Sequence, residues 1–326
     1  MTKSNRWQPS SSAAIARFRA SMLDRARQYF RAQGVLEVDT PALSRSAVSD
    51  PHIESVAATL ALDAKTDYYL HTSPEYTMKR LLCDGYPDIY QICKVFRDNE
   101  FGRRHQPEFT MIEWYRLNFK LKQIANDTLA FIAAILQRPS LSSGAIHLNY
   151  ADAFEEFAGC DPFTADLAEL IAIADADASL IESIGDEKDA WLDLILDQKI
   201  VPQFATDRLT VLSHYPLSQA ALARQCPVHP AAADRFEVFL GHSELANGYV
   251  ELVDADEHAR RFAEDQAKRK LHGQTERPLD NQFLDAIRHG LPECAGVAVG
   301  FDRLLMIHAG TEDIRDVQTF AFAEQS

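Results

Sequence analysis

One stretch, residues 91–116, constrains the fold of this chain more than any other. It begins with an apolar run, continues with a polar segment that contains Gly102 and Pro107, and ends with alternating side chains. Glycine and proline mark the middle segment as a loop, and alternating side chains point to opposite faces of a strand. The stretch therefore predicts two strands joined by a loop, with Glu113 on the same face as Phe109.

This predicted hairpin carries charges that suit a binding site better than a core. Glu113 shares its face with Phe109 and Tyr115, and Arg97 and other arginines flank the adjoining loop. A strand-borne carboxylate beside loop-borne arginines suggests a small cationic group bound next to a phosphate. The alternative is a solvated arginine-rich hairpin, which either feature alone would favour.

Charge is unevenly distributed along the 326 residues. The formal net charge is −15, and residues 151–198 hold 14 acidic side chains and one basic side chain. An acidic chain is a poor candidate for binding nucleic acid by phosphate neutralisation. An acidic protein partner that meets the basic N-terminal region, with Arg17, Arg19, Arg25 and Arg27, is an alternative to plain solvated helix faces.

The cysteines and the chain start bear on the cellular compartment. The spacing of the five cysteines contains no CxxC pair, which predicts reduced thiols, no disulfide framework and no zinc site. Arginines stand where a secretion signal would be apolar, and no apolar run approaches the roughly 20 residues of a membrane span. We therefore expect a cytoplasmic protein without membrane association. The cysteines are Cys83, Cys93, Cys160, Cys226 and Cys294.

The N-terminal region predicts a helix and then an extended segment. Ser10 to Ser12 can cap a helix, and apolar residues then recur at helical spacing up to Phe30. Gly34 is expected to end this helix, and Pro41 to close the extended segment.

The middle of the chain predicts mainly helices. Residues 73–82 form a helical stripe with Glu75 in the first turn, where the helix dipole favours a carboxylate. We expect a further helix over residues 117–136, a linker over 138–145, and an acidic, mainly helical insertion over 147–204.

Residues 235–252 predict a second hairpin, which turns at Gly241. Glu237 and Glu244 lie on its adjoining strands, and two carboxylates near a phosphate site can hold Mg²⁺. Charges that protect an exposed sheet edge are the alternative. Three further polar residues of the second strand share one face: Asn247, Tyr249 and Glu251.

A third strand, from Cys294, alternates large and small residues. Val297 and Val299 are expected in the core, with a helix from Leu304 onward. The opposite face holds only small residues and leaves backbone open to a flat ligand; tight packing against a helix is the alternative. The small residues are Gly296, Ala298 and Gly300.

These segments resemble the class II aminoacyl-tRNA synthetases of the lysyl type. The helix, Gly34 and Pro41 resemble motif 1, RHQPEFTMIEWY resembles motif 2, and GVAVGFDR resembles motif 3. SPEYTMKRLL and ELANGYVEL resemble segments of the lysyl-type amino-acid pocket. The chain shows no counterpart of the anticodon-binding barrel, which makes it similar to the truncated paralogues of the elongation factor P–(R)-β-lysine ligase family.

The resemblance implies an α+β fold, in which an antiparallel sheet is flanked by helices in a single catalytic domain over residues 1–326. It implies a homodimer that uses ATP and Mg²⁺. The activity implied is activation of (R)-β-lysine, with α-lysine activated poorly, and transfer to a lysine of elongation factor P; no tRNA is expected. Two alternatives are a minimal lysyl-tRNA synthetase-like enzyme and a catalytically inactive regulatory module.

The resemblance also implies site residues. Arg97 and Arg303 would be catalytic, with Arg97 on the α-phosphate, and Glu237 and Glu244 would bind Mg²⁺. The ATP set would be Arg97, Asp98, Asn99, Glu100, His105, Gln106, Phe109, Glu244, Leu245, Gly300 and Arg303, with Phe109 stacked on adenine. The substrate set would be Ser73, Pro74, Glu75, Glu113, Tyr115, Asn247, Tyr249, Glu251 and Ala298. In it, Glu75 and Glu113 would meet the backbone-side amine, and Tyr115 and Glu251 the distal amine.

Two positions depart from the family pattern. Motif 2 usually reads FRxE, whereas this chain has Asn99 at the fourth place and Glu100 one place later. Either residue could supply the missing contact. Ala298 stands where lysyl-tRNA synthetases carry glycine, which adds one methyl group to the expected pocket floor.

Overall fold

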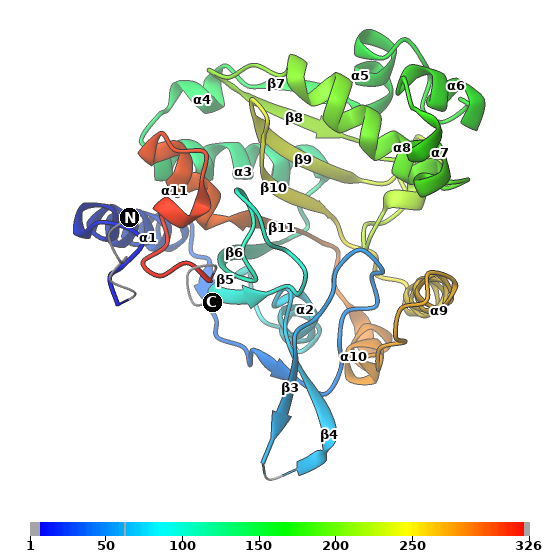
Figure 1. Cartoon of the computed structure of the whole chain (residues 1–326). Helices are drawn as coiled ribbons and strands as arrows, with labels where there is room; N and C mark the ends of the chain where they lie inside the picture. The colour runs from blue at the N-terminus through cyan, green and yellow to red at the C-terminus, as the bar shows by residue number, and fades with distance from the viewer. Residues whose placement is uncertain (1–6, 62, 323–326) are drawn as a thin grey trace. The chain divides into compact units, whose positions relative to one another are not determined.

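The computed structural model describes residues 7–61 and 63–322. Contacts within the chain define two compact units. Their helices and strands are labelled in Figure 1. Unit 1 comprises Met1–Asn118, Ala134–Leu136 and Val253–Ser326, and unit 2 comprises Phe119–Ala133 and Gln137–Leu252.

Unit 1 contains the predicted motif 2 hairpin. Its strands follow the order β1-β5-β6-β11, in which β1 pairs with β5 in parallel and the other pairs are antiparallel. The strands are β1 (Leu36–Glu37), β5 (Ile89–Phe96), β6 (Glu108–Leu117) and β11 (Cys294–Gly300). The two apolar-rich segments of residues 91–116 therefore do pair with each other, as the sequence predicts.

The register between β6 and β11 separates a core face from a site face. Val297 pairs with Trp114, and all three of Val297, Val299 and Trp114 are buried. On the alternate positions, Ala298 pairs with Glu113. Because paired residues point to the same face of a sheet, the small residues of β11 lie beside the polar residues of β6.

The rest of unit 1 comprises a small sheet and several helices. The small sheet has the order β2-β4-β3, with β2 (Leu43–Ser44), β3 (Ala57–Leu60) and β4 (Asp63–Leu70). The helices are α1 (Ala13–Ala32), α2 (Glu75–Cys83), α9 (Ala255–Leu271), α10 (Asn281–Gly290), α11 (Phe301–Ala309) and the 3₁₀ turn η4 (Ile314–Asp316). Ser12 caps α1, because its side chain accepts a hydrogen bond from the backbone N of Ile15.

Unit 2 has its own four strands, in the order β10-β9-β8-β7, all antiparallel except β7 with β8. They are β7 (Ile146–Asn149), β8 (Leu209–Ser213), β9 (Arg235–Leu240) and β10 (Ser243–Val250). The longer helices are α3 (Leu121–Leu136, of which Ala134–Leu136 belong to unit 1), α5 (Tyr150–Phe157), α6 (Leu167–Ile173), α7 (Ala178–Ile184) and α8 (Lys188–Ile195). Shorter turns are α4 (Ser140–Ser143), η1 (Leu196–Ile200), η2 (Val201–Gln203) and η3 (Leu217–Gln219).

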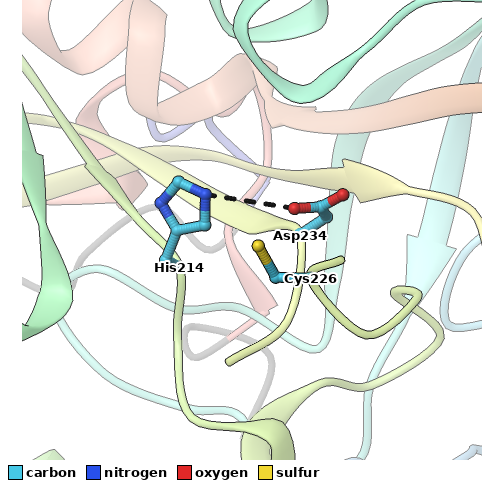
Figure 2. A group of neighbouring side chains, drawn as sticks. All are labelled: His214, Cys226 and Asp234. Atoms are coloured by element: carbon cyan, nitrogen blue, oxygen red, sulfur yellow. Dashed lines mark ion pairs between the residues drawn. The ribbon is translucent and has the colours of Figure 1, made fainter. Parts of the chain in front are cut away.

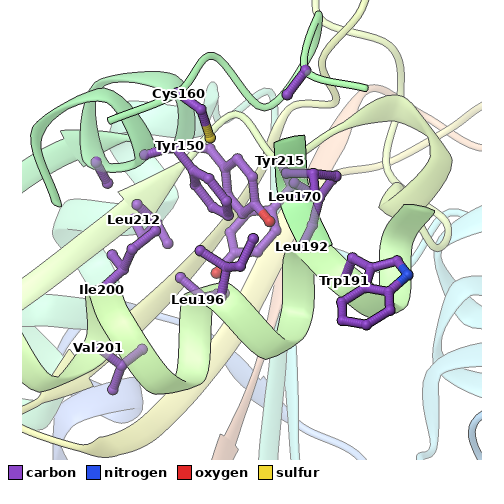
Figure 3. Packing of buried hydrophobic residues seen from close by; sticks show 14 of the residues in the cluster. Tyr150, Cys160, Leu170, Trp191, Leu192, Leu196, Ile200, Val201, Leu212 and Tyr215 are labelled. Atoms are coloured by element: carbon purple, nitrogen blue, oxygen red, sulfur yellow. The ribbon is translucent and has the colours of Figure 1, made fainter. Parts of the chain in front are cut away.

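The acidic segment of unit 2 is held by a core of its own (Figure 3). Trp191 and Tyr150 are fully buried in this cluster, together with apolar residues of α5, α6 and α8. The Trp191 indole N–H donates to the Gly185 carbonyl at 2.9 Å. The aspartates and glutamates of residues 151–198 are therefore compatible with an ordinary packed helical layer that has a solvated face.

Four sequence-based boundaries are corrected by the structure. The helix expected from residue 117 begins at Leu121, because β6 continues to Leu117 and Asn118 turns the chain with φ of 59°. The linker over 138–145 contains α4, and the segment from 147 begins inside β7. The C-terminal helix begins at Phe301, ahead of Leu304.

Across the described residues, none of the helices combines the length and apolar character that crossing a bilayer requires.

Candidate active site

Glu113 is the centre of a polar cluster in unit 1. It lies on β6 and is 3% exposed. The Tyr115 hydroxyl donates to one carboxylate oxygen at 2.6 Å, and the Ser73 hydroxyl donates to the other at 2.7 Å. Ser73 also accepts from the backbone N of Glu75 at 3.0 Å, just after Pro74, the residue that precedes α2. The structure thus brings together four predicted substrate residues, Ser73, Glu75, Glu113 and Tyr115. They span 42 positions of the sequence, from Ser73 to Tyr115.

A second carboxylate, Glu75, adds to the negative charge of this cluster. Burial, and then the charge of Glu75, raise the pKa of Glu113 to about 7. Glu75 itself is paired with Lys79 at 2.5 Å, and Lys79 is fully buried. Two carboxylates with one internal cation leave a net negative site, which suits a cationic ligand.

The neighbouring strand β11 leaves space beside this cluster. Ala298 lies opposite Glu113, Gly296 opposite Tyr115, and Gly300 opposite Met111. From Gly296 to Gly300, no residue on this face of β11 has a side chain larger than a methyl group. Larger side chains at these positions would cover the Glu113 carboxylate. The small residues that the sequence pattern predicts on this face therefore form the floor of the site.

Arg97 lies at the end of β5, in contact with the ring of Phe109. Its guanidinium is 5.2 Å from the ring centroid and donates to the Thr72 carbonyl at 3.5 Å. It also pairs with Glu100 at 3.3 Å. Asn99 instead adopts a left-handed φ of 63°, and its backbone N donates to Asp98. Of the two residues left open by the sequence, Glu100 is therefore the one that contacts Arg97.

Arg303, in the first turn of α11, meets the motif 2 loop. Its guanidinium lies 2.9 Å from His105 Nε2. Gln106, which the sequence also assigned to the nucleotide, is 1% exposed, and its side-chain oxygen accepts from the backbone N of Phe322 at 2.9 Å. Gln106 thus links the loop to the C-terminal segment.

Unit 2 contains a second buried carboxylate cluster around Glu237. One oxygen of Glu237 pairs with Arg235 at 2.6 Å, and the other accepts from the Tyr215 hydroxyl at 2.7 Å. Burial, and then the charge of Glu244, raise the pKa of Glu237 to about 7. Arg235 also donates to Asn247 at 3.2 Å, across the β9–β10 pair.

The remaining predicted residues of unit 2 lie on or just after β10. Leu245 is buried, and Tyr249 packs against a small cluster of buried alanines. Glu251 is 1% exposed and forms a β-bridge with Ala223. Glutamates are almost never this deeply buried unless they are paired.

The basic N-terminal helix is less available to a partner than its sequence suggests. Arg19 turns inward, where it pairs with Asp302 and donates to Thr110. Arg25 donates to the Ile135 carbonyl at 2.9 Å, and Arg27 pairs with Glu37 at 3.1 Å.

Three polar residues of these clusters were missed by the sequence analysis. Lys79 lies four residues after Glu75 on a predicted helix, and Arg235 lies two residues before Glu237 on a predicted strand, so spacing alone could have indicated both. Tyr215 follows β8 and reaches Glu237 only through the pairing of β8 with β9. No local pattern indicates that contact.

Comparison with known proteins identifies the family of this chain. The model of the tRNA synthetases class II (D, K and N) matches residues 6–324. The elongation factor P–(R)-beta-lysine ligase of Haemophilus influenzae is 40% identical over 325 residues, covering 98% of this chain and 99% of that protein. The proteins of that name from Salmonella gallinarum and Salmonella arizonae are 39% identical, with 98% of each chain covered. This chain therefore belongs to the class II tRNA synthetase family, in the group that includes these ligases.

Proposed function

We propose that this chain is an ATP-dependent ligase that activates (R)-β-lysine as an adenylate and transfers it to a lysine of elongation factor P. The observation that carries the proposal is the buried Glu113 cluster, whose surplus negative charge lies beside a floor of small residues. A diamino acid has two ammonium groups, so it suits a pocket with this charge. The names of the similar proteins support the same substrate and acceptor.

The first step joins the amino acid to AMP. The substrate carboxylate attacks the α-phosphorus of ATP, and pyrophosphate leaves. Arg97 would donate to the α-phosphate oxygens as charge develops there, and Glu100 would hold its guanidinium in place. Phe109 would stack on adenine, with Arg303 on its other side. His105, already beside Arg303, would fix that side chain.

The second step transfers the acyl group. The neutral ε-amine of the acceptor lysine attacks the carbonyl carbon of the mixed anhydride, the bond from that carbon to the AMP oxygen breaks, and the amine proton passes to the departing phosphate or to water as the amide forms. The first step requires no protein side chain as a general base, because the attacking carboxylate carries no proton.

Amine recognition would be divided between the two carboxylate-bearing regions. Glu75 and Glu113 would receive the amine nearest the substrate carboxylate. Glu251, with Asn247, Tyr249 and the Tyr115 hydroxyl, would receive the distal amine. Charge-assisted hydrogen bonds of this kind are roughly twice as strong as neutral ones, which supports selection of a dication over neutral amino acids.

Glu237 and Glu244 fit a divalent cation. The charge of Glu244 raises the pKa of Glu237, so the two carboxylates repel each other and a bound cation would relieve that repulsion. Each Glu237 oxygen has one recorded hydrogen-bonding partner, which leaves a lone pair for coordination. Mg²⁺ held there would neutralise phosphate charge when ATP is bound.

Three further features belong to the proposal. The enzyme would act as a homodimer through the motif 1 region, where Leu36 of the short edge strand β1 is 45% exposed. It would work in the cytoplasm, where its acceptor acts in translation, and without tRNA. Light scattering at several protein concentrations tests the dimer directly.

The decisive experiment is mass spectrometry of elongation factor P incubated with this protein, ATP and (R)-β-lysine. We expect one added β-lysyl group on one lysine, and no aminoacylation of bulk tRNA under the same conditions. Charging of tRNA without modification of the factor would indicate a minimal synthetase, and neither product would indicate an inactive module.

Arg97→Ala tests the mechanism within that reaction. We expect ATP–pyrophosphate exchange to fall on the order of 10²–10³-fold, as for the loss of one charge-stabilising donor. Arg103→Ala is the matched control, because that exposed loop arginine pairs only with Glu312 among the recorded ion pairs. Near-normal exchange in Arg97→Ala would remove the proposed role of this arginine.

A further inference from the structure

A histidine, a cysteine and an aspartate converge in unit 2, and none of the three is among the residues assigned to ATP, Mg²⁺ or lysine (Figure 2). His214 directly follows β8, and Asp234 directly precedes β9. These strands pair, and the His214 N–H donates to the Arg235 carbonyl at 2.8 Å, so the two residues are held at adjacent strand ends. Cys226 lies in the intervening loop, which is closed by a hydrogen bond from its N–H to the Ala232 carbonyl at 2.8 Å.

We propose that His214, Cys226 and Asp234 form a binding site for a transition-metal dication of the Zn²⁺ class. One nitrogen, one sulfur and one oxygen atom of these side chains all lie within 4.8 Å of one another. In a tetrahedral zinc site the metal–ligand distances of ~2.0–2.3 Å imply ligand–ligand separations of roughly 3.3–3.8 Å. His214 Nε2 and Asp234 Oδ1 are already 3.9 Å apart, so small side-chain rotations would complete the geometry.

The imidazole of His214 is oriented as a metal ligand. Asn149 donates through its side-chain nitrogen to Asp152 at 3.0 Å, which leaves its oxygen facing His214 Nδ1, also at 3.0 Å. An amide oxygen only accepts, so Nδ1 carries the proton and Nε2 presents a lone pair toward Asp234. Metal-bound histidines usually have this kind of second hydrogen bond.

The sulfur of Cys226 is carried by a loop that backbone hydrogen bonds hold in place. Cys226 is 2% exposed, its N–H donates to the Ala232 carbonyl at 2.8 Å, and its carbonyl accepts from the His229 N–H at 3.3 Å. Burial raises the pKa of the thiol, but a bound dication deprotonates a coordinating thiol outright.

Asp234 is held by a second interaction that leaves one oxygen available. Arg224 donates to Asp234 Oδ2 at 2.8 Å, whereas Oδ1 faces His214. This mixed set of nitrogen, sulfur and oxygen ligands selects a borderline metal such as Zn²⁺ and disfavours Mg²⁺, which takes oxygen ligands.

A cavity of about 380 Å³ adjoins two of the three residues. His214 and Cys226 line it, together with Asn149 and His229. Three protein ligands with an open side are the arrangement of zinc sites that keep a fourth position for water or another small ligand. The cavity therefore leaves room for that fourth ligand.

The test is titration of the tag-free protein with Co²⁺ in excess Mg²⁺, which saturates the proposed carboxylate pair. We expect one equivalent to bind, with thiolate-to-cobalt absorption in the near ultraviolet and displacement by Zn²⁺. Cys226→Ser should abolish that absorption. Asn149→Ala should weaken binding roughly 10–100-fold, because it removes the partner that orients His214.

Two further variants keep the test decisive. Cys160→Ser, at a buried cysteine of the same unit, should bind Co²⁺ like the unaltered protein. His214→Asn removes Nε2 but tolerates the positive φ of 62° at this position, so it tests the site even if Cys226→Ser fails to fold. Absence of Co²⁺ binding by the unaltered protein, or full absorption in folded His214→Asn, would overturn the proposal. Neither result depends on ligase activity.

Discussion

Glu113 and Glu237 are two buried glutamates on strands, each with a pKa raised to about 7, yet their partners differ in kind. Glu113 accepts its recorded hydrogen bonds from neutral hydroxyls, those of Tyr115 and Ser73. Glu237 accepts one from Tyr215 but also pairs directly with the cation Arg235.

This difference suggests different roles for the two charges: that of Glu113 is kept for a ligand, whereas that of Glu237 also stabilises the fold. Hydroxyls orient Glu113 without neutralising it, so a bound ammonium group would gain most of the attraction. Glu237 is paired directly with a cation, and its loss would leave Arg235 in a buried position without that partner. Stability should therefore depend more on Glu237 than on Glu113, and binding of the amino acid on Glu113.

The largest expected effect is on folding. Glu237→Gln should lower the free energy of unfolding by about 2–3 kcal/mol, toward the low end for breaking a buried pair, because Arg235 keeps hydrogen bonds to Asn247 and Gln219. Urea unfolding monitored by circular dichroism measures it. Adding Arg235→Gln to Glu237→Gln should recover part of the loss. If the loss in free energy of unfolding of the double variant equals the sum of the losses of the two single variants, the two residues do not stabilise the fold as a pair, which would contradict the comparison.

Next in size is the effect on substrate binding. Glu113→Gln should raise the KM for the amino acid roughly 30-fold, equivalent to about 2 kcal/mol, because a charge-assisted contact becomes neutral. The KM for ATP should hardly change. Near neutral pH this variant should be at least as stable in urea as the unaltered protein, because burial disfavours the charged form of Glu113; a loss as large as that for Glu237→Gln would show that Glu113 is structural.

A smaller effect concerns the floor opposite Glu113. Ala298→Gly removes the one methyl group between Gly296 and Gly300, and a methylene-sized difference in a pocket is worth roughly 1–3 kcal/mol of discrimination. We expect kcat/KM for α-lysine to improve relative to (R)-β-lysine, because the methyl would crowd an amine carried at Cα. An unchanged ratio in adenylate formation would make Ala298 a packing residue only.

The smallest effect is the dependence on pH. Because the folded protein holds the Glu113 proton more tightly than the ordinary value of 4.5 allows, stability of the free protein should fall as pH rises from about 4.5 to 7. Binding of the diamino acid requires the carboxylate, so it should tighten as pH rises through about 7. Titration calorimetry at several pH values checks both the affinity and the proton release; Glu113→Gln should flatten the profile.

Local pattern was sufficient for much of the fold and of the candidate site. Alternation over β6 and β11 predicts which side chains share the site face, because the strand period is 2 whatever the sheet does. Ser12 and Gly34 bound the first helix through capping and a positive φ. The boundaries that failed, at Leu121 and Phe301, lie where a strand passes almost directly into a helix and no proline marks the change.

The sequence by itself determined the family motifs, the faces of the strands, and the acidic residues that a diamino acid would meet. Only the tertiary structure decided which charges are compensated, because Tyr215 reaches Glu237 through strand pairing. It also brings Cys226 to His214 and Asp234, although the cysteine spacing predicts no zinc site. Periodicity and capping act over a few residues, whereas contacts between segments depend on register and loop closure, which a local pattern does not specify.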